Sequence, residues 1–264
     1  MNTLIQKAKY SFKTLLWILN AYVGKPVWVE SPEKLTVLIT YFNPVRMKKI
    51  NHQIRNILKC EFVDKLIISN HNPDIHIQDK LKVNDDRLTI LNQSVKRGCG
   101  FRWLVANGFD FKYLIVIDDD FLISAQQLAS LFRRLLEEPN IPHGLAGMNC
   151  LPAGGFEYRD KENVVVDFLC EVYAVTKSHL DRFMEINSSI SSDAKIARIV
   201  DSTADFMIVS QTGTSRPKIH DVGRLFRDET FKTEGVAVHK NQTFEEHMEQ
   251  ILNALRSLGL GERR

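Results

Sequence analysis

Cysteine is scarce in this chain, and no two cysteines are close together in sequence. The four cysteines, Cys60, Cys99, Cys150 and Cys170, lie far apart and form no CxxC pair. A zinc site built on cysteine pairs is therefore not indicated. Isolated thiols that stay reduced and buried are typical of a cytosolic protein, so we expect a cytoplasmic location.

A large excess of charge is also missing, and so is a long apolar run. The formal net charge is +3 over 264 residues, which is too small to indicate nucleic-acid binding. The apolar run at residues 15–19 is far shorter than the roughly 20 residues that a membrane span needs. No small-residue cleavage site of the signal-peptide kind follows it.

The N-terminal segment instead has the pattern of a basic amphipathic helix. Its apolar residues recur at helical spacing, with Lys7, Lys9 and Lys13 between them. Such a helix either lies on an anionic membrane surface as a peripheral contact or docks on its own domain, and the sequence leaves both open. Glycine and proline at residues 24, 26 and 32 mark a linker. We expect this helix and linker over residues 1–33 and the main domain over residues 34–264.

The most informative stretch is Tyr-Leu-Ile-Val-Ile-Asp-Asp-Asp at residues 113–120. The uninterrupted apolar run predicts a strand buried on both faces, with Asp118, Asp119 and Asp120 at its carboxyl end, where open α/β sheets place their ligands. Three adjacent anions repel one another, and their hard oxygen donors suit Mg²⁺ or Mn²⁺ shared with phosphate oxygens. The alternative is a solvated turn that caps the next helix, although that helix has its own start signal at Ser124.

Strand and helix patterns alternate around this stretch. Strands are predicted at 35–40, 66–68 and 88–91, and helices at 44–58, 100–107 and 124–136. This alternation predicts a Rossmann-like, mainly parallel sheet. The second half is less regular, with strands predicted at 144–150, 168–175 and 235–240, helices at 178–186, from 205 and at 243–258, and a polar loop at 187–193.

Three of these segments carry a resemblance to a known family. They are LTVLITYFN at 35–43, KLIISN at 65–70 and IDDDFLIS at 117–124. In this order they resemble glycosyltransferases of the GT-A fold, which have an Asp-x-Asp motif where this chain has residues 118–120. The exostosin-type transferases of family 64 are the most similar, and family 2 follows. The resemblance implies an α/β GT-A domain, a mixed and mainly parallel sheet flanked by helices, with a nucleotide-binding half at 34–140 and an acceptor and catalytic half at 141–264.

The implied activity is sugar transfer. The donor would be a nucleotide-diphosphate sugar, most simply a UDP-sugar, the cofactor Mn²⁺ or Mg²⁺, and the acceptor a hydroxyl of a saccharide or glycan. A hexosyl- or N-acetylhexosaminyltransferase is implied, and the family 64 likeness favours retention of configuration. Two alternatives stay open. One is nucleotidyl transfer that forms the sugar nucleotide, against which the loop at 40–46 has no glycine; the other is a non-catalytic nucleotide-sugar-binding domain.

The resemblance also assigns residues to roles. The nucleotide or its diphosphate would contact Thr40, Tyr41, Asn70, Arg97, Arg102, Asp118 and Asp119. The metal ion would be held by Asp118, Asp120 and His239, with His220 as a weaker alternative. Gly154 and Gly155 either let the donor sugar approach the backbone or form a plain turn. Tyr41 equally suits the edge of the core, Arg97 a solvated helix and His239 a structural role.

Asp205 is the predicted catalytic residue. Related families have an acidic pair before a helix at this place, but here Ala204 precedes Asp205, so the pair is incomplete. In an inverting enzyme the carboxylate would deprotonate the acceptor, and in a retaining enzyme it would stabilise the transition state beside the anomeric carbon. Ser202 and Asp205 also have the spacing of a capping box, and the two roles are compatible.

Overall fold

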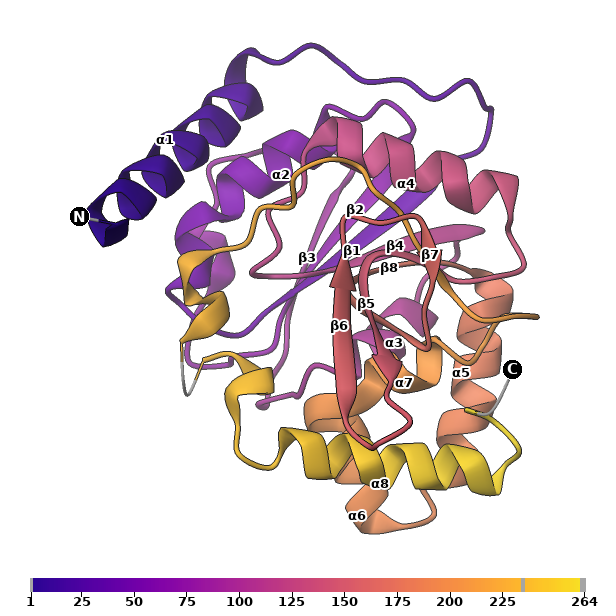
Figure 1. Cartoon of the computed structure of the whole chain (residues 1–264). Helices are drawn as coiled ribbons and strands as arrows, with labels where there is room; N and C mark the ends of the chain where they lie inside the picture. The colour runs from indigo at the N-terminus through magenta and orange to yellow at the C-terminus, as the bar shows by residue number, and fades with distance from the viewer. Residues whose placement is uncertain (1, 234–235, 262–264) are drawn as a thin grey trace.

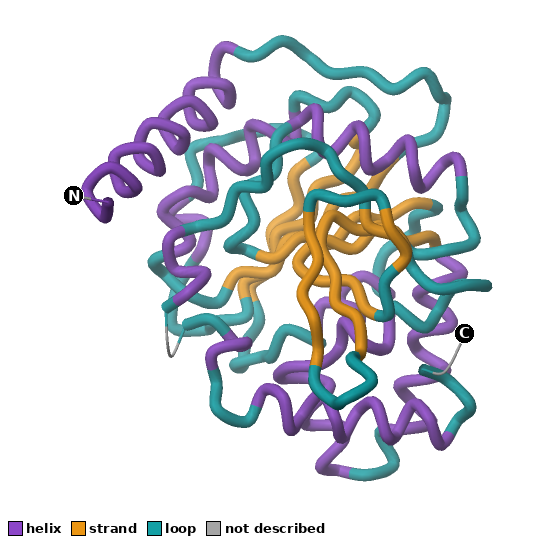
Figure 2. The backbone as a smooth tube through the Cα atoms, viewed as in Figure 1, coloured by secondary structure: helices purple, strands orange, loops and turns teal. Residues whose placement is uncertain are grey.

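The protein is a three-layer α/β structure in which one sheet lies between two groups of helices (Figure 1). The computed structural model describes residues 2–233 and 236–261. Its nine-stranded sheet has the order β3-β2-β1-β4-β8-β5-β9-β7, and β6 pairs with β5. In Figure 2 the strands form a twisted central band, and the loops that connect them gather at its ends.

The elements follow one another in a regular order. The strands are β1 (Leu35–Tyr41), β2 (Val63–Asn70), β3 (Leu88–Asn92), β4 (Tyr113–Asp118), β5 (His143–Cys150), β6 (Phe156–Asp160), β7 (Val164–Val165), β8 (Phe168–Thr176) and β9 (Lys218–Ile219). The α-helices are α1 (Asn2–Val23), α2 (Ile50–Leu58), α3 (Phe101–Asn107), α4 (Ala125–Glu137), α5 (Lys177–Ile190), α6 (Ala194–Ile199), α7 (Asp205–Val209) and α8 (Phe244–Ser257).

Strand β1 shows how the two cores form. Successive side chains of a strand point to opposite faces, so Leu35, Val37 and Ile39 pack against α2 and α4. Leu38 points to the other face, where α3, α5, α7 and α8 cover the sheet. All four side chains have no exposed surface. Because both faces are covered, the strand reads as a continuous apolar run, as predicted for a central parallel strand.

The order of the strands reverses beside β1. The chain adds β2 and β3 in parallel on one side of β1 and then places β4 in parallel on the other side. Thr40 at the end of β1 lies opposite Asp118 at the end of β4. This is the position at which open α/β sheets form a crevice for ligands. Beyond β4 the sheet becomes antiparallel through β8 and β5.

Several predicted elements are confirmed, and three are corrected. Helix α4 begins with the predicted capping box of Ser124 and Gln127. Residues 187–190 continue α5 instead of starting a loop, because Ile186 and Ile190 both bury their side chains. No capping box occurs at Ser202, because residues 194–209 are helical throughout, with a π-helical turn at Val200–Ala204. The strand predicted at 235–240 is wrong where the structure describes it: residues 238–240 form a 3₁₀ turn, and residues 234 and 235 lie outside the described part.

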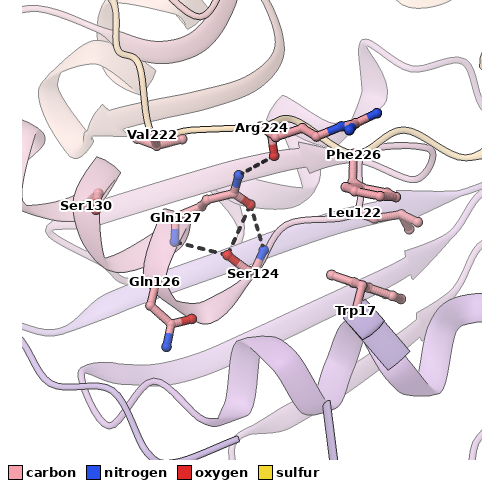
Figure 3. A pocket seen from close by; sticks show the side chains of 9 residues that line it. All are labelled: Trp17, Leu122, Ser124, Gln126, Gln127, Ser130, Val222, Arg224 and Phe226. Carbon is pink, nitrogen blue, oxygen red and sulfur yellow. Dashed lines mark hydrogen bonds between the residues drawn. The ribbon is translucent and has the colours of Figure 1, made fainter. Parts of the chain in front are cut away.

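Helix α1 docks on the domain next to α2, as one of the two predicted alternatives requires (Figure 1). Trp17 is buried and donates a hydrogen bond from Nε1 to the carbonyl oxygen of Ile123 at 3.1 Å. Figure 3 shows Trp17 beside the capping box of α4, where it lines a small pocket of about 220 Å³. None of the helices in the described part of the chain is long and apolar enough to cross a bilayer.

Candidate functional site

A large cleft opens at the carboxyl ends of β1 and β4. Its volume is about 880 Å³. Loops after β1, β2 and β4 form one wall. The other wall is formed by β6, β8, the π-helical turn, residues 227–232 and residues 236–248. The predicted site residues on its lining are Thr40, Tyr41, Arg97, Arg102, Asp118, Asp119, Asp120 and His239. The reversal in strand order therefore brings together residues that are up to two hundred positions apart in sequence.

Two arginines contact the three adjacent aspartates. Arg46 contacts Asp119 Oδ1 through Nη1 at 2.5 Å and Asp120 Oδ2 through Nη2 at 2.8 Å. Arg102 donates a hydrogen bond from Nη1 to Asp118 Oδ1. Asp120 is nearly buried, and Asp118 is the most open of the three, with 30% of its side chain exposed. Two guanidinium groups, one of them shared with Asp205, thus supply part of the positive charge that this cluster is predicted to need.

Burial dominates the electrostatics of the cluster. It raises the pKa of the Asp120 carboxyl well above the ordinary value, Arg46 lowers that pKa, and the charges of Asp119 and Asp118 raise it further. Burial likewise raises the pKa of Asp118, against the lowering effect of Arg102. These carboxylates are therefore held in an environment that favours any additional cation.

Asp205 forms the buried base of the site. Its side chain has no exposed surface, and it accepts hydrogen bonds from Arg102 Nε at 2.7 Å, Arg102 Nη2 at 3.1 Å and Trp103 Nε1 at 2.6 Å. Cys99 Sγ lies 3.4 Å from its Oδ1. Asp205 itself does not line the cleft, whereas Ser202, Thr203 and Phe206 do. Its influence on the cleft passes through Arg102.

Glycine allows the loop before α3 to lie against the π-helical turn. A Cβ atom at Gly98 would come within 2.1 Å of the carbonyl oxygen of Asp201, and one at Gly100 within 2.4 Å of that of Val200. The backbone N–H of Gly100 donates to the Asp201 carbonyl at 2.8 Å. This close approach fixes the start of α3, and with it Arg102, relative to Asp205.

The predicted nucleotide contacts differ in how they meet the cleft. Arg97 is exposed on the cleft lining, and its guanidinium carbon lies 4.4 Å from the ring centre of Phe101. Tyr41 is almost fully buried, and burial raises its pKa. Asn70 has no exposed surface: its Nδ2 donates to Ile75 O and Asn92 Oδ1, and its Oδ1 accepts from Asn72 N. The side chain of Asn70 therefore stabilises the loop after β2 through its hydrogen bonds.

Two residues of the cleft that sequence reasoning missed are Glu171 and Arg227. Arg227 donates from Nε and Nη2 to the two oxygens of Glu171 at 2.7 and 2.8 Å. Glu171 has a φ of 67°, a left-handed conformation that costs a residue with a Cβ atom, at an irregularity in the pairing of β5 and β8. Strained backbone of this kind is often found at functional sites. No feature of the sequence marks a glutamate for this conformation.

A C-terminal segment, residues 226–232, covers the acidic cluster. The backbone N–H of Asp228 donates to the carbonyl of Asp120 at 2.6 Å, and that of Leu122 donates to Phe226 O at 2.8 Å. Asp228 also accepts a hydrogen bond from Lys49 Nζ, and Thr230 Oγ1 accepts one from Arg46 Nε at 3.0 Å. This covering segment ties the end of the fold to the loop after β1.

The donor chemistry of the cluster fits a divalent cation, but its present arrangement does not. Carboxylate oxygens suit Mn²⁺ or Mg²⁺. However, Arg46 lies on two of the three carboxylates, and no group of three or more histidine, cysteine or acidic side chains is arranged to hold an ion within the described residues. His239 packs against Phe231, with ring centres 4.8 Å apart. His220 lies apart from the cleft lining, with its Nε2 2.9 Å from Nδ1 of His143.

Comparison with known proteins identifies the fold. No protein-family model matches the chain, and no curated protein matches it in sequence. Among solved structures, it is similar to GalNAc-T7 crystallised with UDP, GalNAc and Mn²⁺, with a TM-score of 0.57 and 9% sequence identity over 84% of this chain and 48% of that chain. The chain thus spans about half the length of that protein. At this identity the likeness shows the fold alone, and the fold is GT-A, as predicted.

Proposed function

We propose that this protein is a glycosyltransferase that uses a nucleotide-diphosphate sugar. The observation that carries the proposal is the acidic triplet at the point where the strand order reverses, facing a cleft of about 880 Å³ with arginines on its walls. A nucleoside diphosphate needs positive charge for its phosphates, and a sugar needs hydrogen-bonding groups for its hydroxyls. The cleft offers both. The GT-A neighbour was crystallised with UDP, GalNAc and Mn²⁺, which supports a UDP-sugar as donor.

The chain's own residues would divide the work along the cleft. Thr40 and Tyr41 would contact the nucleoside, since they end β1 on the cleft floor. Arg97 and Arg102 would hold the diphosphate, for which the guanidinium fork is suited. Asp118 and Asp119 would orient the ribose and the sugar. Asp205 is proposed as a positioning residue that fixes Arg102; the direct catalytic role assigned to it by the resemblance stays a prediction.

A divalent ion would be held by Asp118 and Asp120, with His239 as the further predicted ligand. When bound, Mn²⁺ or Mg²⁺ supplies positive charge that stabilises the departing nucleoside diphosphate. The acceptor would be a hydroxyl of a saccharide or glycan that enters between β6, β8 and α8. The finer expectations, which are a family 64 relation, hexosyl or N-acetylhexosaminyl transfer and retention of configuration, stay predictions.

A panel of nucleotide sugars tests the proposal. Thermal stabilisation and slow hydrolysis of each donor are measured with Mn²⁺, for the unaltered protein, Asp120→Ala and the matched control Asp110→Asn. Asp110 is exposed and lies just before β4, at the opposite end from the triplet. We expect one UDP-sugar to stabilise and be hydrolysed, Asp120→Ala to lose both effects, and Asp110→Asn to keep them.

Other outcomes would select the alternatives. Stabilisation by a donor without hydrolysis or transfer would indicate a non-catalytic binding domain. Release of pyrophosphate from UTP and a sugar phosphate would indicate nucleotidyl transfer. No stabilisation by any nucleotide sugar, with or without metal, would overturn the proposal.

Contact of α1 with a membrane surface also stays a prediction. Leu15, Leu16 and Leu19 on this helix are about half exposed. The face that carries Trp17 and Ala21 is buried against the domain. Docking on the domain therefore leaves apolar side chains available to an anionic surface.

A further inference from the structure

Arg46 stands where a divalent cation would bind the acidic triplet. We propose that Arg46 is an exchangeable counter-ion: it neutralises Asp119 and Asp120 when no metal ion is present, and it must leave them for Mn²⁺ or Mg²⁺ to bind. This inference rests on the proposed function for the role of the metal ion, but its test measures metal binding and requires no enzymatic activity. It makes Arg46 a positioning residue that sets the affinity for the metal ion.

Arg46 occupies one carboxylate oxygen of Asp120, which is a predicted metal ligand, and one of Asp119. Its Nη1 lies 2.5 Å from Asp119 Oδ1, and its Nη2 lies 2.8 Å from Asp120 Oδ2. A small divalent ion binds carboxylate oxygens at roughly 2.0–2.2 Å and takes the same lone pairs. Because both cations carry positive charge, they also repel each other at this separation. At Asp120, Arg46 and a metal ion therefore compete for the carboxylate.

Arg46 makes two contacts with carboxylates, whereas Arg102 makes three. Arg102 is only 4% exposed, binds Asp205 through two nitrogens and lies over the ring of Tyr173. Arg46 instead reaches each carboxylate with one nitrogen, and its buried Nη2 has no hydrogen bond in proper alignment despite its closeness to Asp120. Buried donors without an aligned acceptor are rare in folded proteins. Of these two arginines, we therefore expect Arg46 to be the one that a metal ion displaces.

Release would keep Arg46 inside the cleft. Its Nε donates to Thr230 Oγ1, a neutral acceptor in the covering segment, and this bond involves neither aspartate. Arg46 follows β1 on a short 3₁₀ turn, Arg46–Lys49, and lines the cleft. A guanidinium freed from the carboxylates then has donors for the phosphate oxygens of a nucleoside diphosphate. Metal binding would in this way prepare the diphosphate site.

Mn²⁺ binding without nucleotide tests the exchange. The electron paramagnetic resonance signal of free Mn²⁺ is titrated with the unaltered protein, Arg46→Gln, and the control Arg55→Gln. Arg55 lies on α2, where its guanidinium carbon is 5.1 Å from the ring centre of Tyr22, away from the cleft. We expect Arg46→Gln to bind Mn²⁺ at least tenfold more tightly and Arg55→Gln to bind it as the unaltered protein does. Adding Asp120→Asn to Arg46→Gln should abolish the gain.

A second variant and a second measurement keep the test valid if Arg46→Gln folds poorly. Arg46→Lys keeps the charge but replaces the two-nitrogen fork by a single ammonium group. Its Mn²⁺ affinity should therefore lie between that of the unaltered protein and that of Arg46→Gln. Mn²⁺ should also raise the Tm of Arg46→Gln more than that of the unaltered protein. Folded Arg46 variants that bind Mn²⁺ no more tightly than the unaltered protein, or no Mn²⁺ binding by any of them, would overturn the exchange.

UDP binding separates this inference from the proposed function. A gain in Mn²⁺ affinity on Arg46→Gln supports the exchange even where no nucleotide sugar binds. Binding of a UDP-sugar without that gain supports the transferase and overturns the exchange. The two ideas therefore fail on different measurements.

Discussion

Arg102 joins Asp205 to Asp118. It binds both oxygens of the fully buried Asp205 through Nε and Nη2, and it uses Nη1 to hold the first carboxylate of the triplet. The residue predicted to be catalytic thus shares one guanidinium with the residue predicted to hold the nucleotide or metal ion. A substitution at Asp205 should therefore change the position of Arg102 and its hydrogen bond with Asp118.

Replacing Asp205 by Asn should cost about 3–5 kcal/mol of unfolding free energy, because it leaves the charge of the buried Arg102 without its main partner. Urea unfolding measures the loss. The control is Asp181→Asn, an exposed residue of α5, which should cost less than about 1 kcal/mol. A folded Asp205→Asn protein with normal stability and normal UDP binding, but without turnover, would favour direct catalysis over positioning.

Arg97→Ala should weaken UDP binding by about ten- to a hundredfold, the loss expected for a hydrogen bond to a charged group. Stability should hardly change, since the side chain is exposed. Isothermal titration with UDP and Mn²⁺ measures the effect. Lys96→Ala removes the neighbouring charge, which is paired with Asp74 on the surface, and should leave the affinity as it is. Equal affinities for the two variants would remove Arg97 from the diphosphate site.

The left-handed conformation of Glu171 predicts that a glycine variant is more stable than an alanine variant at this position, the reverse of the usual order of stability. Glycine has no steric penalty at a φ of 67°, so Glu171→Gly should be more stable than Glu171→Ala by about 1 kcal/mol. Both variants lose the pair with Arg227, so that loss cancels in the comparison. At the next residue, Val172, the usual order should hold, with alanine more stable than glycine by about 0.5–1 kcal/mol. Chemical denaturation of the four variants measures their unfolding free energies. If Glu171→Ala is more stable than Glu171→Gly, the backbone at position 171 is not strained.

Acid should destabilise the fold through the pair of His143 and His220. Burial lowers the pKa of His220 from 6.5 to about 4, and it also lowers the pKa of His143. The folded state keeps these rings neutral while the unfolded chain takes up protons, so the stabilisation is complete above pH 6.5 and is lost as the pH falls towards 4. His220 alone should contribute about 3 kcal/mol to this loss.

Urea unfolding between pH 7.5 and 4 checks the prediction. His220→Gln should flatten the profile, and His76→Gln, a change at an exposed histidine, should not. An identical slope in the His220 variant and the unaltered protein would show that this pair does not govern acid sensitivity.

The sequence predicted those parts of the fold whose signals are local. The apolar run before Asp118 became a strand buried on both faces, and Ser124 with Gln127 began α4 as expected. The antiparallel pairing of β8 with β4 and β5 was not predictable, because the residue pattern of a strand does not show which strand it pairs with or in which direction. The helix from Asp205 was predicted, but the helical residues 194–204 before it were missed, because Ser202 and Asp205 imitate a helix start. Tertiary packing of Val200, Thr203 and Ala204 overrode that signal.

The candidate site was predictable to the same extent. Asp118, Asp119 and Asp120 are adjacent in sequence, so their clustering was certain once the strand was placed. Arg46 and Asp119 are 73 positions apart, and no local pattern pairs them. The sequence likewise suggested that Asn70 faces a ligand, whereas the structure shows that both ends of its amide are engaged by the loop after β2.

The covering segment has a consequence for the order in which the protein is made. Asp120 leaves the ribosome long before Phe226 and Asp228. The hydrogen bond from Asp228 N–H to the Asp120 carbonyl, and the one from Leu122 N–H to the Phe226 carbonyl, can form only after the later residues have been made. The wall over the triplet can be completed only after residues 226–228 have been synthesised. A nascent or truncated chain that stops before residue 226 carries the three aspartates and Arg46 but has no Thr230 to hold the arginine.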